Sequence, residues 1–474
     1  MTGNPLIWGA LLQTPSEHPS RPSVKCMHTR DDSGLSIRKL NSAAIPRRGT
    51  VLRDHLAVVA GRSVAVALRL VRPGGGTALP GMVAHRVSPG LLPRILAGPR
   101  EGIVVVTGSS GKSTTTHMLA AILRQHGLNV FTNNRTANIT KGLVSELLPH
   151  LDRHNRLTAD IAVLEIDEGY SALITEQVPA RVSVLLNVMI DQLHRWHEPE
   201  RVASYLGRTA AATDDTVVIN ADDPHLAAIG VALEGSAGTP DIRRFAVASD
   251  LSPPSTHIRS APVHGGSPTA SPASPHTSVI KTLDATALIR VDNTTIAIEL
   301  PTAGIHIASD AAAAIEGARA VLGERFDPDT TQRAFHQMTG VAGRNERVTI
   351  GHHEVDLVFT KSPASMQINL DLFDHSAEQV MVAVGKDIFD TSQLWLVDWS
   401  ELPDVAVVSG WQAWDTALRL AYDEVEVAKV EPDIRIATRE FTSGPSQPDG
   451  HSTIIYTPEA MRVMRRNLRL AWTS

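Results

Sequence analysis

The sequence predicts an α/β protein of more than one domain, built around a mainly parallel sheet. The chain has 474 residues, well above the ~150 residues that suggest a single domain. Hydrophobic residues make up 42% of it and charged residues 20%, as in ordinary globular proteins. Short apolar runs alternate with helical patterns along most of the chain, which is typical of β-α-β units.

The elements follow one another in two blocks. Residues 1–50 have few aliphatic positions and no clear periodicity, so we expect a flexible N-terminal tail. Folded protein is expected from Val51, where the chain becomes rich in Ala, Val and Leu. The first block then reads as a strand at Ile103–Val106, a helix at Ser113–Gln125, and further alternating segments at Ile161–Ile166, Val182–Asn187, Tyr205–Ala212 and Val217–Asn220.

A stretch rich in Ser, Pro and Gly interrupts this alternation between Gly235 and His276. Such a composition buries too little apolar area to offset the cost of ordering, so we expect a loop or disordered insert. Order is expected to resume with two paired strands and a helix, and a second block starts near Asp327. The segments after the insert are Ala285–Val291, Thr295–Leu300, Ala311–Val321, Val355–Phe359, Val380–Val384, Val405–Val408, Trp414–Tyr422, Thr453–Tyr456 and a closing helix. We therefore predict a tail at 1–50, a central domain at 51–325 with its insert at 235–276, and a smaller C-terminal α/β domain at 326–474.

Composition excludes several classes of protein. The net charge of −6 gives no basic footprint for nucleic acid. The single cysteine, Cys26, excludes an intrachain disulfide framework, a cysteine zinc ribbon and a CxxC redox pair, and it indicates a reducing compartment. The early apolar run Pro5–Leu12 is too short to span a bilayer. The sequence therefore predicts a cytoplasmic protein that does not bind nucleic acid.

The most informative segment joins a buried strand to a helix through Gly108-Ser-Ser-Gly-Lys-Ser113. Backbone amides at a helix N-terminus hold phosphate oxygens, a lysine neutralises the terminal phosphates, and a hydroxyl reaches the bound magnesium. Lys112 and Ser113 stand where these two roles need them. Val106 occupies the place of a further glycine in the strict P-loop pattern, so this loop is a shorter variant. The alternative is a Gly/Ser turn that leads into a capped helix.

Two glutamates, Glu165 and Glu168, follow the next strand pattern, in Val163-Leu-Glu-Ile-Asp-Glu168. A carboxylate at the end of a strand beside a phosphate loop is the usual second anchor for magnesium, which prefers oxygen ligands on a rigid element. Glu165 is the better candidate, and a solvated acidic loop is the alternative. His194 and His197 lie three residues apart, but no third ligand has a fixed spacing to them, so we expect a surface or cleft role.

The loop Thr107-Gly-Ser-Ser-Gly-Lys-Ser-Thr114 resembles the Thr-Gly-Thr-Asn-Gly-Lys-Thr-Thr loop of the Mur ligases, ATP-dependent enzymes that join a carboxylate to an amine. Further stretches resemble the MurT family within them, which provides the ligase subunit of lipid II isoglutaminyl synthase. These stretches are Gly75–Gly81, Asn187–Leu193, Asn220–Pro224, Gly343–Arg347, Lys361–Ala364 and Ile455–Met461.

This resemblance implies a central P-loop domain of the Mur ligase type, a Rossmann-like C-terminal domain, and amidation of a carboxylate. The expected reaction converts D-glutamate in lipid II to D-isoglutamine through an acyl phosphate, with ATP and Mg²⁺. Lys112, Glu165 and Arg344 are the expected catalytic groups, and Ser113 with Glu165 would hold the magnesium. The expected nucleotide-binding residues are Thr107, Gly108, Ser109, Ser110, Gly111, Lys112, Ser113, Thr114, Asn187, Asp310, Arg344 and Lys361, and Asp191 lies on a family motif beside them.

The resemblance also implies a partner, a GatD-type glutaminase that supplies ammonia. The residues support this independently, because such a glutaminase needs a cysteine nucleophile and this chain offers only Cys26 in its tail. In the family, an aspartate of the C-terminal domain completes the partner's Cys-His pair. Asp387 and Asp390 both remain candidates here, and both remain open to a plain role in capping loops.

Several positions depart from the family pattern. The zinc ribbon of the relatives uses four cysteines that this chain lacks, so no structural zinc is expected. Two asparagines said to meet the adenine are here Ile307 and Asp310, so recognition of the adenine must differ. The alternatives to the isoglutaminyl synthase role are a paralogue that acts on another carboxylate and a nucleotide-binding scaffold without catalysis. We expect the protein at the inner membrane face only where a lipid-linked substrate brings it there.

Overall fold

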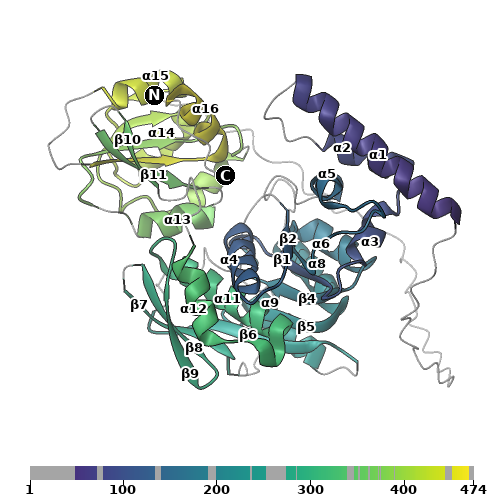
Figure 1. The fold of residues 1–474 in the computed structure, drawn as a ribbon. Helices are drawn as coiled ribbons and strands as arrows, with labels where there is room; N and C mark the ends of the chain where they lie inside the picture. The colour runs from purple at the N-terminus through teal and green to yellow at the C-terminus, as the bar shows by residue number, and fades with distance from the viewer. Residues whose placement is uncertain are drawn as a thin grey trace, which may run out of the picture. The chain divides into compact units, whose positions relative to one another are not determined.

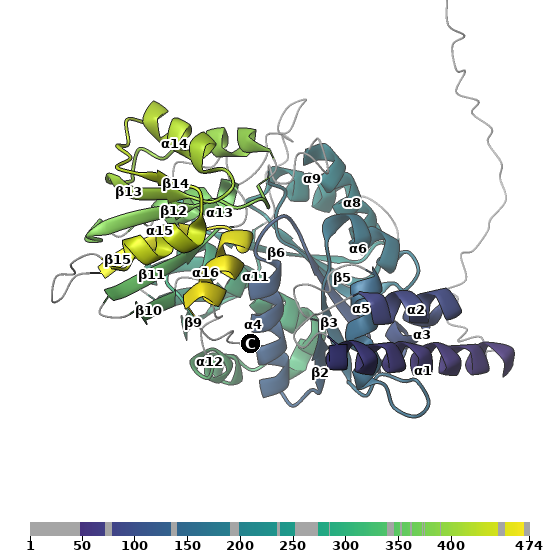
Figure 2. The ribbon, with the colours of Figure 1, turned by 90° about the horizontal axis from the view of Figure 1, so that it is seen from above.

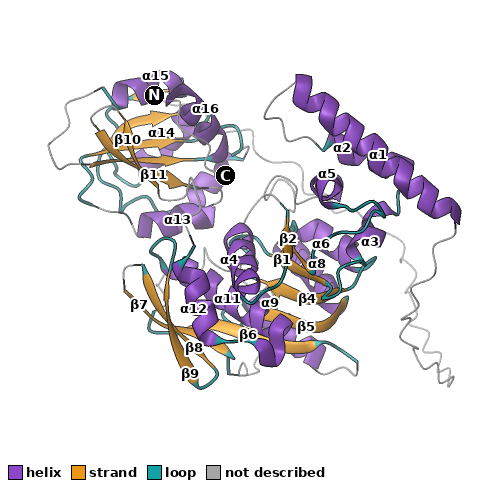
Figure 3. Cartoon of the chain, in the orientation of Figure 1, coloured by secondary structure: helices purple, strands orange, loops and turns teal. Residues whose placement is uncertain are grey.

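The computed structural model places fifteen strands in two sheets, both flanked by helices (Figures 1 and 3). It describes residues 48–71, 78–133, 140–189, 199–234, 238–251, 274–283, 285–338, 346–350, 353–360, 363–371, 373, 375–388, 390–443 and 451–468. The α/β fold class predicted from the sequence is confirmed.

The first sheet has nine strands in the order β2-β3-β1-β4-β5-β6-β7-β8-β9. Neighbours from β2 to β7 pair in parallel, whereas β7, β8 and β9 pair antiparallel. The strands are β1 (Ile103–Thr107), β2 (Val130–Thr132), β3 (Ile161–Glu165), β4 (Ala180–Leu185), β5 (Thr213–Asn220), β6 (Asp241–Val247), β7 (Thr277–Leu283), β8 (Thr286–Val291) and β9 (Thr294–Glu299). Every residue of β1 and β3 is buried, as expected for parallel strands covered on both faces.

Helices on both faces of this sheet close two separate cores. Strand β1 contributes Val104 and Val106 to one core and Ile103 and Val105 to the other, because side chains alternate along a strand. The helices are α1 (Arg48–Val71), α2 (Leu79–Val87), α3 (Leu91–Leu96), α4 (Lys112–Gln125), α5 (Thr140–Leu147), η2 (Leu148–His150), α6 (Glu168–Thr175), α8 (Pro199–Ala211), α9 (Pro224–Glu234), α11 (Ile305–Leu322), η3 (Gly323–Arg325) and α12 (Pro328–His336). The alanine-rich α11 packs against α4, β6 and β7.

One sequence-based prediction is wrong within the first sheet. The insert expected at 235–276 contains strand β6, Asp241–Val247, which pairs in parallel with β5. Its apolar residues Ile242, Phe245 and Ala246 are buried. The composition of the longer Pro- and Ser-rich stretch masked this short strand. Residues 252–273, the centre of the expected insert, lie outside the described part of the chain.

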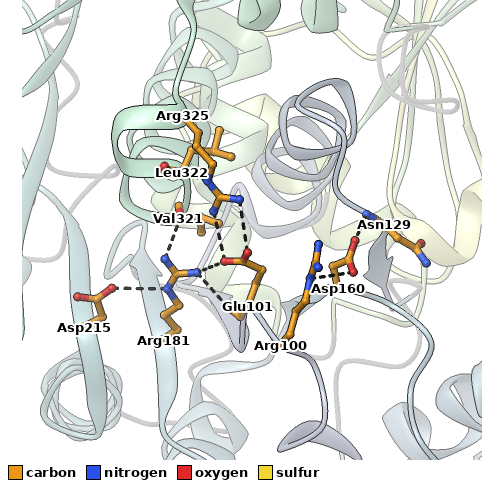
Figure 4. A network of polar contacts seen from close by, with 9 residues as sticks. All are labelled: Arg100, Glu101, Asn129, Asp160, Arg181, Asp215, Val321, Leu322 and Arg325. Carbon is orange, nitrogen blue, oxygen red and sulfur yellow. Dashed lines mark hydrogen bonds and ion pairs between the residues drawn. The ribbon is translucent and has the colours of Figure 1, made fainter.

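A network of charged groups lies at the amino ends of the strands of the first sheet (Figure 4). Glu101, just before β1, accepts hydrogen bonds from Arg181 of β4 and from Arg325 of η3. Arg181 also donates to the carbonyl of Val321 at the end of α11. Burial acts to raise the pKa of Glu101, but the two arginines outweigh it and hold that pKa below its ordinary value. The network fixes the C-terminal end of α11 to the strand ends.

The second sheet has six strands in the order β10-β11-β15-β12-β13-β14, and all its neighbours pair in parallel except β10 with β11. Its strands are β10 (Glu346–Ile350), β11 (His353–Phe359), β12 (Gln379–Ala383), β13 (Val405–Ser409), β14 (Val430–Glu431) and β15 (His451–Tyr456). Its helices are α13 (Pro363–Asp371), η4 (Thr391–Leu396), α14 (Ala413–Tyr422), α15 (Ile434–Phe441) and α16 (Pro458–Leu468). The domain boundary predicted at 325/326 stays a prediction.

No helix within the described ranges is long and apolar enough to cross a membrane. Within the same ranges, no group of three or more His, Cys, Asp or Glu side chains is arranged to hold a metal ion. Figure 2 shows α1 and α2 running alongside each other, as in Figure 1.

Candidate nucleotide site at the carboxyl ends of the strands

The loop after β1 turns sharply into α4 at the carboxyl edge of the first sheet. The backbone of Gly108 has a φ of 138° and that of Gly111 a φ of 83°, both in the region that favours glycine. A Cβ at Gly108 would lie 3.0 Å from the backbone N of Asn187. Helix α4 begins at Lys112, and the amides of its first turn have no partner inside the helix. The loop thus presents a helix N-terminus suited to an anion.

Lys112 is buried in this loop and pairs with a carboxylate. Its Nζ donates to Oε1 of Glu168 at 2.8 Å, to the carbonyl of Ser109 at 3.2 Å, and to the carbonyl of Gly108. Burial acts to lower the pKa of Lys112, but Glu168 outweighs it, with Glu165 and Asp167 adding to the effect. The pKa therefore lies above its ordinary value, and the ammonium stays charged.

Glu168, rather than Glu165, is the carboxylate in contact with Lys112. Glu168 begins α6, and its side chain is only 4% exposed. Its second oxygen, Oε2, is buried and has no hydrogen-bond partner among the residues that the structure describes. A buried carboxylate oxygen with an unused lone pair is costly, unless a cation approaches it.

Glu165 ends β3, the strand next to the edge strand β2, and is also buried. The side chain of Asn133, just after β2, accepts from the amide of Glu165 and donates to its carbonyl, both at 2.9 Å. Asn133 thereby fixes the direction in which Glu165 leaves the strand. Asn133 is not among the residues predicted from the sequence, because its only signal there is an asparagine directly after an apolar run.

Asn187 clamps the phosphate loop from the end of β4. Its Oδ1 accepts from the amide of Ser110 at 2.8 Å, and its Nδ2 donates to the carbonyl of Ser110 at 3.2 Å. The backbone carbonyl of Asn187 accepts from the amide of Ser109. The predicted role of Asn187 in binding the nucleotide stays a prediction. The structure shows that its side chain holds the backbone of the loop at Ser110.

A buried aspartate supports this clamp from the next strand. Asp223 follows β5 and accepts from the amide of Val188 at 2.8 Å. Its other oxygen accepts from the amides of His225 and Leu226 at the start of α9. The sequence analysis noted this stretch only as part of a family motif. Asp223 therefore links the start of α9 to the segment that holds the loop.

Ile307 and Asp310, the two residues of α11 that differ from the family pattern, lie in different surroundings. Ile307 is buried in a core between the first sheet and its helices. Asp310 is also buried, and its carboxylate lies so close to Gly111 that no Cβ fits there. Gly111 is thus required both by its backbone conformation and by this contact. The structure brings Asp310 to the phosphate loop and assigns Ile307 to packing.

The remaining loop residues lie together at the same edge. Thr107, Ser109 and Thr114 are buried, and Ser113 is half-buried in the first turn of α4. Ser109 Oγ accepts from the amide of Met189 at 3.0 Å. The hydroxyl of Thr107 is buried without a hydrogen-bond partner among the described residues.

Asp387 and Asp390 belong to the second sheet, near the carboxyl ends of its strands. Asp387 Oδ1 accepts from the amide of Glu459 at 3.0 Å and from the hydroxyl of Thr457 at 3.1 Å, at the start of α16. Asp390 caps η4 by accepting from the amide of Ser392 at 3.0 Å. Both aspartates therefore cap local structure. Among the described residues, the hydrogen bonds of Asp387 use Oδ1 and leave Oδ2 for another group.

Several expected site residues lie outside the described part of the chain. They are Cys26, Asp191, His194, His197, Arg344 and Lys361.

The residues present fit a nucleotide phosphate with a divalent cation. The unpaired Oε2 of Glu168 lies next to the charged Lys112 and the N-terminus of α4. An anion on the helix end and a cation on the carboxylate would satisfy both groups. Glu165, Glu168 and Ser113 are candidate oxygen ligands for Mg²⁺ on this edge.

Comparison with known proteins identifies the architecture. The Mur ligase middle domain matches residues 106–318. The chain is 27% identical over 383 residues to the lipid II isoglutaminyl synthase subunit MurT of Streptococcus pneumoniae, covering 75% of this chain and 83% of that one. It is 30% identical over 157 residues to MurT of Staphylococcus aureus, covering 33% of this chain and 35% of the relative. This second match thus spans about a third of the staphylococcal subunit.

A solved structure supports the same fold. MurF ligase from Thermotoga maritima, determined in complex with ADP, superimposes with a TM-score of 0.57 at 15% identity, covering 82% of this chain and 84% of that one. The phosphate loop, the parallel sheet behind it and the sequence matches agree. Residues 106–318 therefore resemble the middle domain of the Mur ligases, and the chain is similar in sequence to MurT proteins.

Proposed function

We propose that this chain is an ATP-dependent ligase subunit that converts a carboxylate to an amide. The observation that carries the proposal is the buried Lys112–Glu168 pair at the N-terminus of α4. A charged ammonium, a helix N-terminus and a buried carboxylate with one unused oxygen are what binding of ATP with magnesium requires.

The reaction follows from the weakness of a carboxylate as an electrophile. A carboxylate oxygen of the substrate attacks the γ-phosphorus of ATP, ADP leaves, and an acyl phosphate forms. Ammonia then attacks the acyl carbon, inorganic phosphate leaves, and the amide remains after loss of a proton. In this scheme Lys112 neutralises charge on the phosphates, while Asn187 keeps the loop in place. Bound Mg²⁺ would neutralise phosphate charge from the side of Glu165, Glu168 and Ser113.

The substrate is proposed from the relatives. The matched MurT proteins are named as subunits of lipid II isoglutaminyl synthase, which supports the α-carboxylate of D-glutamate in lipid II as the group that is amidated. Arg344 and Lys361 are proposed to complete the cleft for ATP and this substrate. The protein is then expected in the cytoplasm, at the membrane face where lipid II lies.

A glutaminase partner is the second part of the proposal. The relatives are named as glutamine-hydrolysing, yet the only cysteine of this chain is Cys26. A GatD-type subunit would supply both the nucleophile and the ammonia. Asp387 is the better candidate to orient the partner's histidine, because its contacts leave Oδ2 unused.

An exposed aromatic face beside Asp387 supports this docking position. Helix α14 presents Trp414, Leu418 and Tyr422 at helical spacing, and Trp411 precedes them, with exposed fractions between 54% and 68%. Trp395 joins them through an edge contact with the ring of Tyr422. Lys386, the neighbour of Asp387, lies over the ring of Trp411 at 4.6 Å. Tryptophan and tyrosine dominate the binding energy of protein interfaces, and three of the chain's seven tryptophans gather on this face.

Measurement of ADP release tests the proposal. The purified chain would be assayed with ATP, MgCl₂ and lipid II, with either ammonium chloride or a GatD-type glutaminase plus glutamine. Release that depends on lipid II and is lost in Lys112→Ala supports the proposed reaction. Release that is lost in Lys112→Ala but does not depend on lipid II identifies another carboxylate as the substrate. ATP binding without turnover under any of these conditions supports a scaffold without catalysis, and absence of both turnover and ATP binding refutes the ligase.

A further inference from the structure

Helix α1 is fixed to the protein by one of its faces only. Ala57 and Val58 are buried in the core between α1, α2 and the first sheet. The carboxylate of Asp54 accepts from Ser88 Oγ at 2.6 Å and pairs with Arg94. Arg62 donates to the carbonyls of Leu148 and Leu151 at 2.9 and 2.7 Å. These contacts orient the helix, and its opposite side is exposed in the part of the chain that the structure describes.

The uncovered side of α1 is apolar along its whole length. Leu52, Leu56, Val59, Val66 and Leu70 are exposed by 49% or more and follow one another at helical spacing, with Ser63 between the third and fourth. We call these five residues the outer face of α1. Residues three and four apart lie on one side of a helix, so the five form one stripe. A helix of 24 residues is about 36 Å long, so the stripe is too extensive to be scattered surface leucines.

The charges beside the outer face are of one sign. The sequence of α1 has four arginines and a histidine against the single acid Asp54. Asp54 is buried in its pair with Arg94, so it offers no negative charge to a molecule approaching from outside. Arg53 and His55 are both exposed. The helix is thus basic in a chain whose net charge is −6.

This charge pattern distinguishes between two molecules that could cover the apolar stripe, a second copy of the chain and a membrane surface. Helices that pair with a second copy normally carry opposite charges beside the apolar seam, whereas two copies of α1 would bring arginine against arginine. A helix that lies in a membrane interface combines an apolar stripe with basic residues, which anionic headgroups attract. The outer face of α1 has this second combination.

We propose that the outer face of α1 binds the surface of an anionic lipid bilayer. The helix lies in the plane of the interface, its leucines and valines enter the boundary between headgroups and acyl chains, and the exposed Arg53 meets lipid phosphates. This extends the sequence-based expectation that contact with the membrane comes through the substrate alone. The inference stands apart from the proposed ligase reaction, because binding to vesicles needs neither nucleotide nor lipid II.

Sedimentation with vesicles tests this directly. The full chain would be mixed, without ATP, with vesicles of phosphatidylcholine alone or with 30 mol% phosphatidylglycerol. We expect binding to the anionic vesicles that weakens with added salt. The variant Leu56→Gln/Val66→Gln should lose at least tenfold in partitioning, while its melting temperature stays that of the wild type because both side chains are exposed. The matched control Val231→Gln/Ile436→Gln changes exposed apolar residues of α9 and α15 and should bind like the wild type.

Four outcomes would count against the proposal. One is absence of binding to anionic vesicles, and another is equal binding by the wild type and the Leu56→Gln/Val66→Gln variant. The third is a dimer, seen by light scattering, that this variant abolishes while vesicles bind neither protein. In that case a second copy covers the outer face. Equal loss of binding in the control pair would also count against α1. None of these outcomes depends on ligase activity, so failure here and failure of the proposed function remain distinguishable.

Discussion

The two sheets differ in the side chains that lie at the carboxyl ends of their strands: buried charged groups in the first, exposed aromatic rings in the second. At the edge of the first sheet, the loop after β1 buries Lys112 against Glu168, and Asn187 and Asp223 fix the backbone around them. At the edge of the second sheet, the loop after β13 leads directly into exposed Trp411 and Trp414. In both sheets the shared topology provides an edge on which loops converge.

This difference suits the first edge to binding a charged ligand and the second edge to binding a protein partner. Buried charge needs a closed network of partners, so the first edge is rigid and suited to hold a highly charged ligand. Exposed aromatic rings gain free energy only when another surface covers them, so the second edge is suited to a protein partner. Changes at the first edge should therefore alter every reaction of the chain, and changes at the second only those that need the partner.

The largest effect is expected for Lys112→Ala. Loss of the ammonium removes the charge that faces the phosphates, and turnover should fall about 10³-fold or more. It also leaves Glu168 buried without its partner, so the thermal melt should be recorded alongside ADP release. Lys281→Ala, at an exposed lysine of β7, is the control for loss of positive charge. Normal turnover in Lys112→Ala would remove the phosphate loop from the reaction.

Glu168→Gln should lower turnover about 10–100-fold and raise the Mg²⁺ concentration required. The same substitution at Glu165 makes the comparison informative, because the two carboxylates differ in their contact with Lys112. If Glu165→Gln alone changes the Mg²⁺ requirement, the metal sits on Glu165 and Glu168 serves only the lysine. Mg²⁺ titrations of ADP release distinguish the two cases.

Glu168→Gln should also change how ATP affinity depends on pH. Wild-type Lys112 has a pKa above its ordinary value because its carboxylate neighbours outweigh burial. Its pairing therefore contributes fully below the ordinary lysine pKa of about 10.4, and the contribution is lost as pH rises through the higher pKa of the folded state. Removing the charge of Glu168 lets burial act with less opposition, so the pKa falls. ATP affinity of Glu168→Gln should decline at lower pH than that of the wild type. Coinciding affinity–pH profiles would contradict the assigned role of the pair.

At the second edge, Trp414→Ala should weaken a glutaminase partner by about 30-fold, since a buried aromatic anchor is worth about 2 kcal/mol. Glutamine-dependent turnover at limiting partner concentration should fall, while turnover with ammonium chloride should stay unchanged. Exposed Leu173 on α6 provides a control in Leu173→Ala. An equal loss with ammonium chloride would show that Trp414 serves something other than docking.

Features of the fold that show as local sequence patterns could be predicted, and features that depend on contacts between distant residues could not. The phosphate loop, the alternation of strands and helices, and the β8–β9 pair were all visible as local patterns. Strand β6 was missed because Phe245 and its neighbours lie beside a long Pro- and Ser-rich stretch that dominates any composition window. Pairings between distant residues were also out of reach, since nothing local links Asn133 to Glu165 or Glu168 to Lys112. Asn187 was found by motif, but its clamp on Ser110 needed coordinates.

Asn187→Ala should have a smaller effect, confined to nucleotide binding. The variant loses two hydrogen bonds to Ser110, each worth about 1 kcal/mol net, while the backbone bond to Ser109 remains. We expect the KM for ATP to rise roughly fivefold to tenfold with little change in kcat, because the loop is loosened and the charged groups stay in place. Asn220, which follows the next strand and donates to the carbonyl of Leu186, gives a neighbouring comparison in Asn220→Ala. A larger fall in kcat than rise in KM would place Asn187 in direct contact with the reacting groups.

The smallest effect is expected at the opposite end of the first sheet. Glu101 pairs with Arg181 and Arg325 (Figure 4), and the arginines hold its pKa below the ordinary value against the effect of burial. A lowered carboxyl pKa stabilises the fold above the unfolded value of about 4.3, and that stability is lost as pH falls through the folded pKa. Glu101→Gln should therefore cost about 1 kcal/mol, or about 2 °C in Tm, at pH 7. The difference in Tm between Glu101→Gln and the wild type should disappear as pH falls below about 4.

The exposed pair of Glu176 with Arg208 is the control, and Glu176→Gln should change Tm less. ADP release should be unaffected in both variants, because this network lies at the amino end of the strands. If Glu101→Gln impaired turnover as much as Asn187→Ala, the carboxyl edge would no longer account for the chemistry by itself.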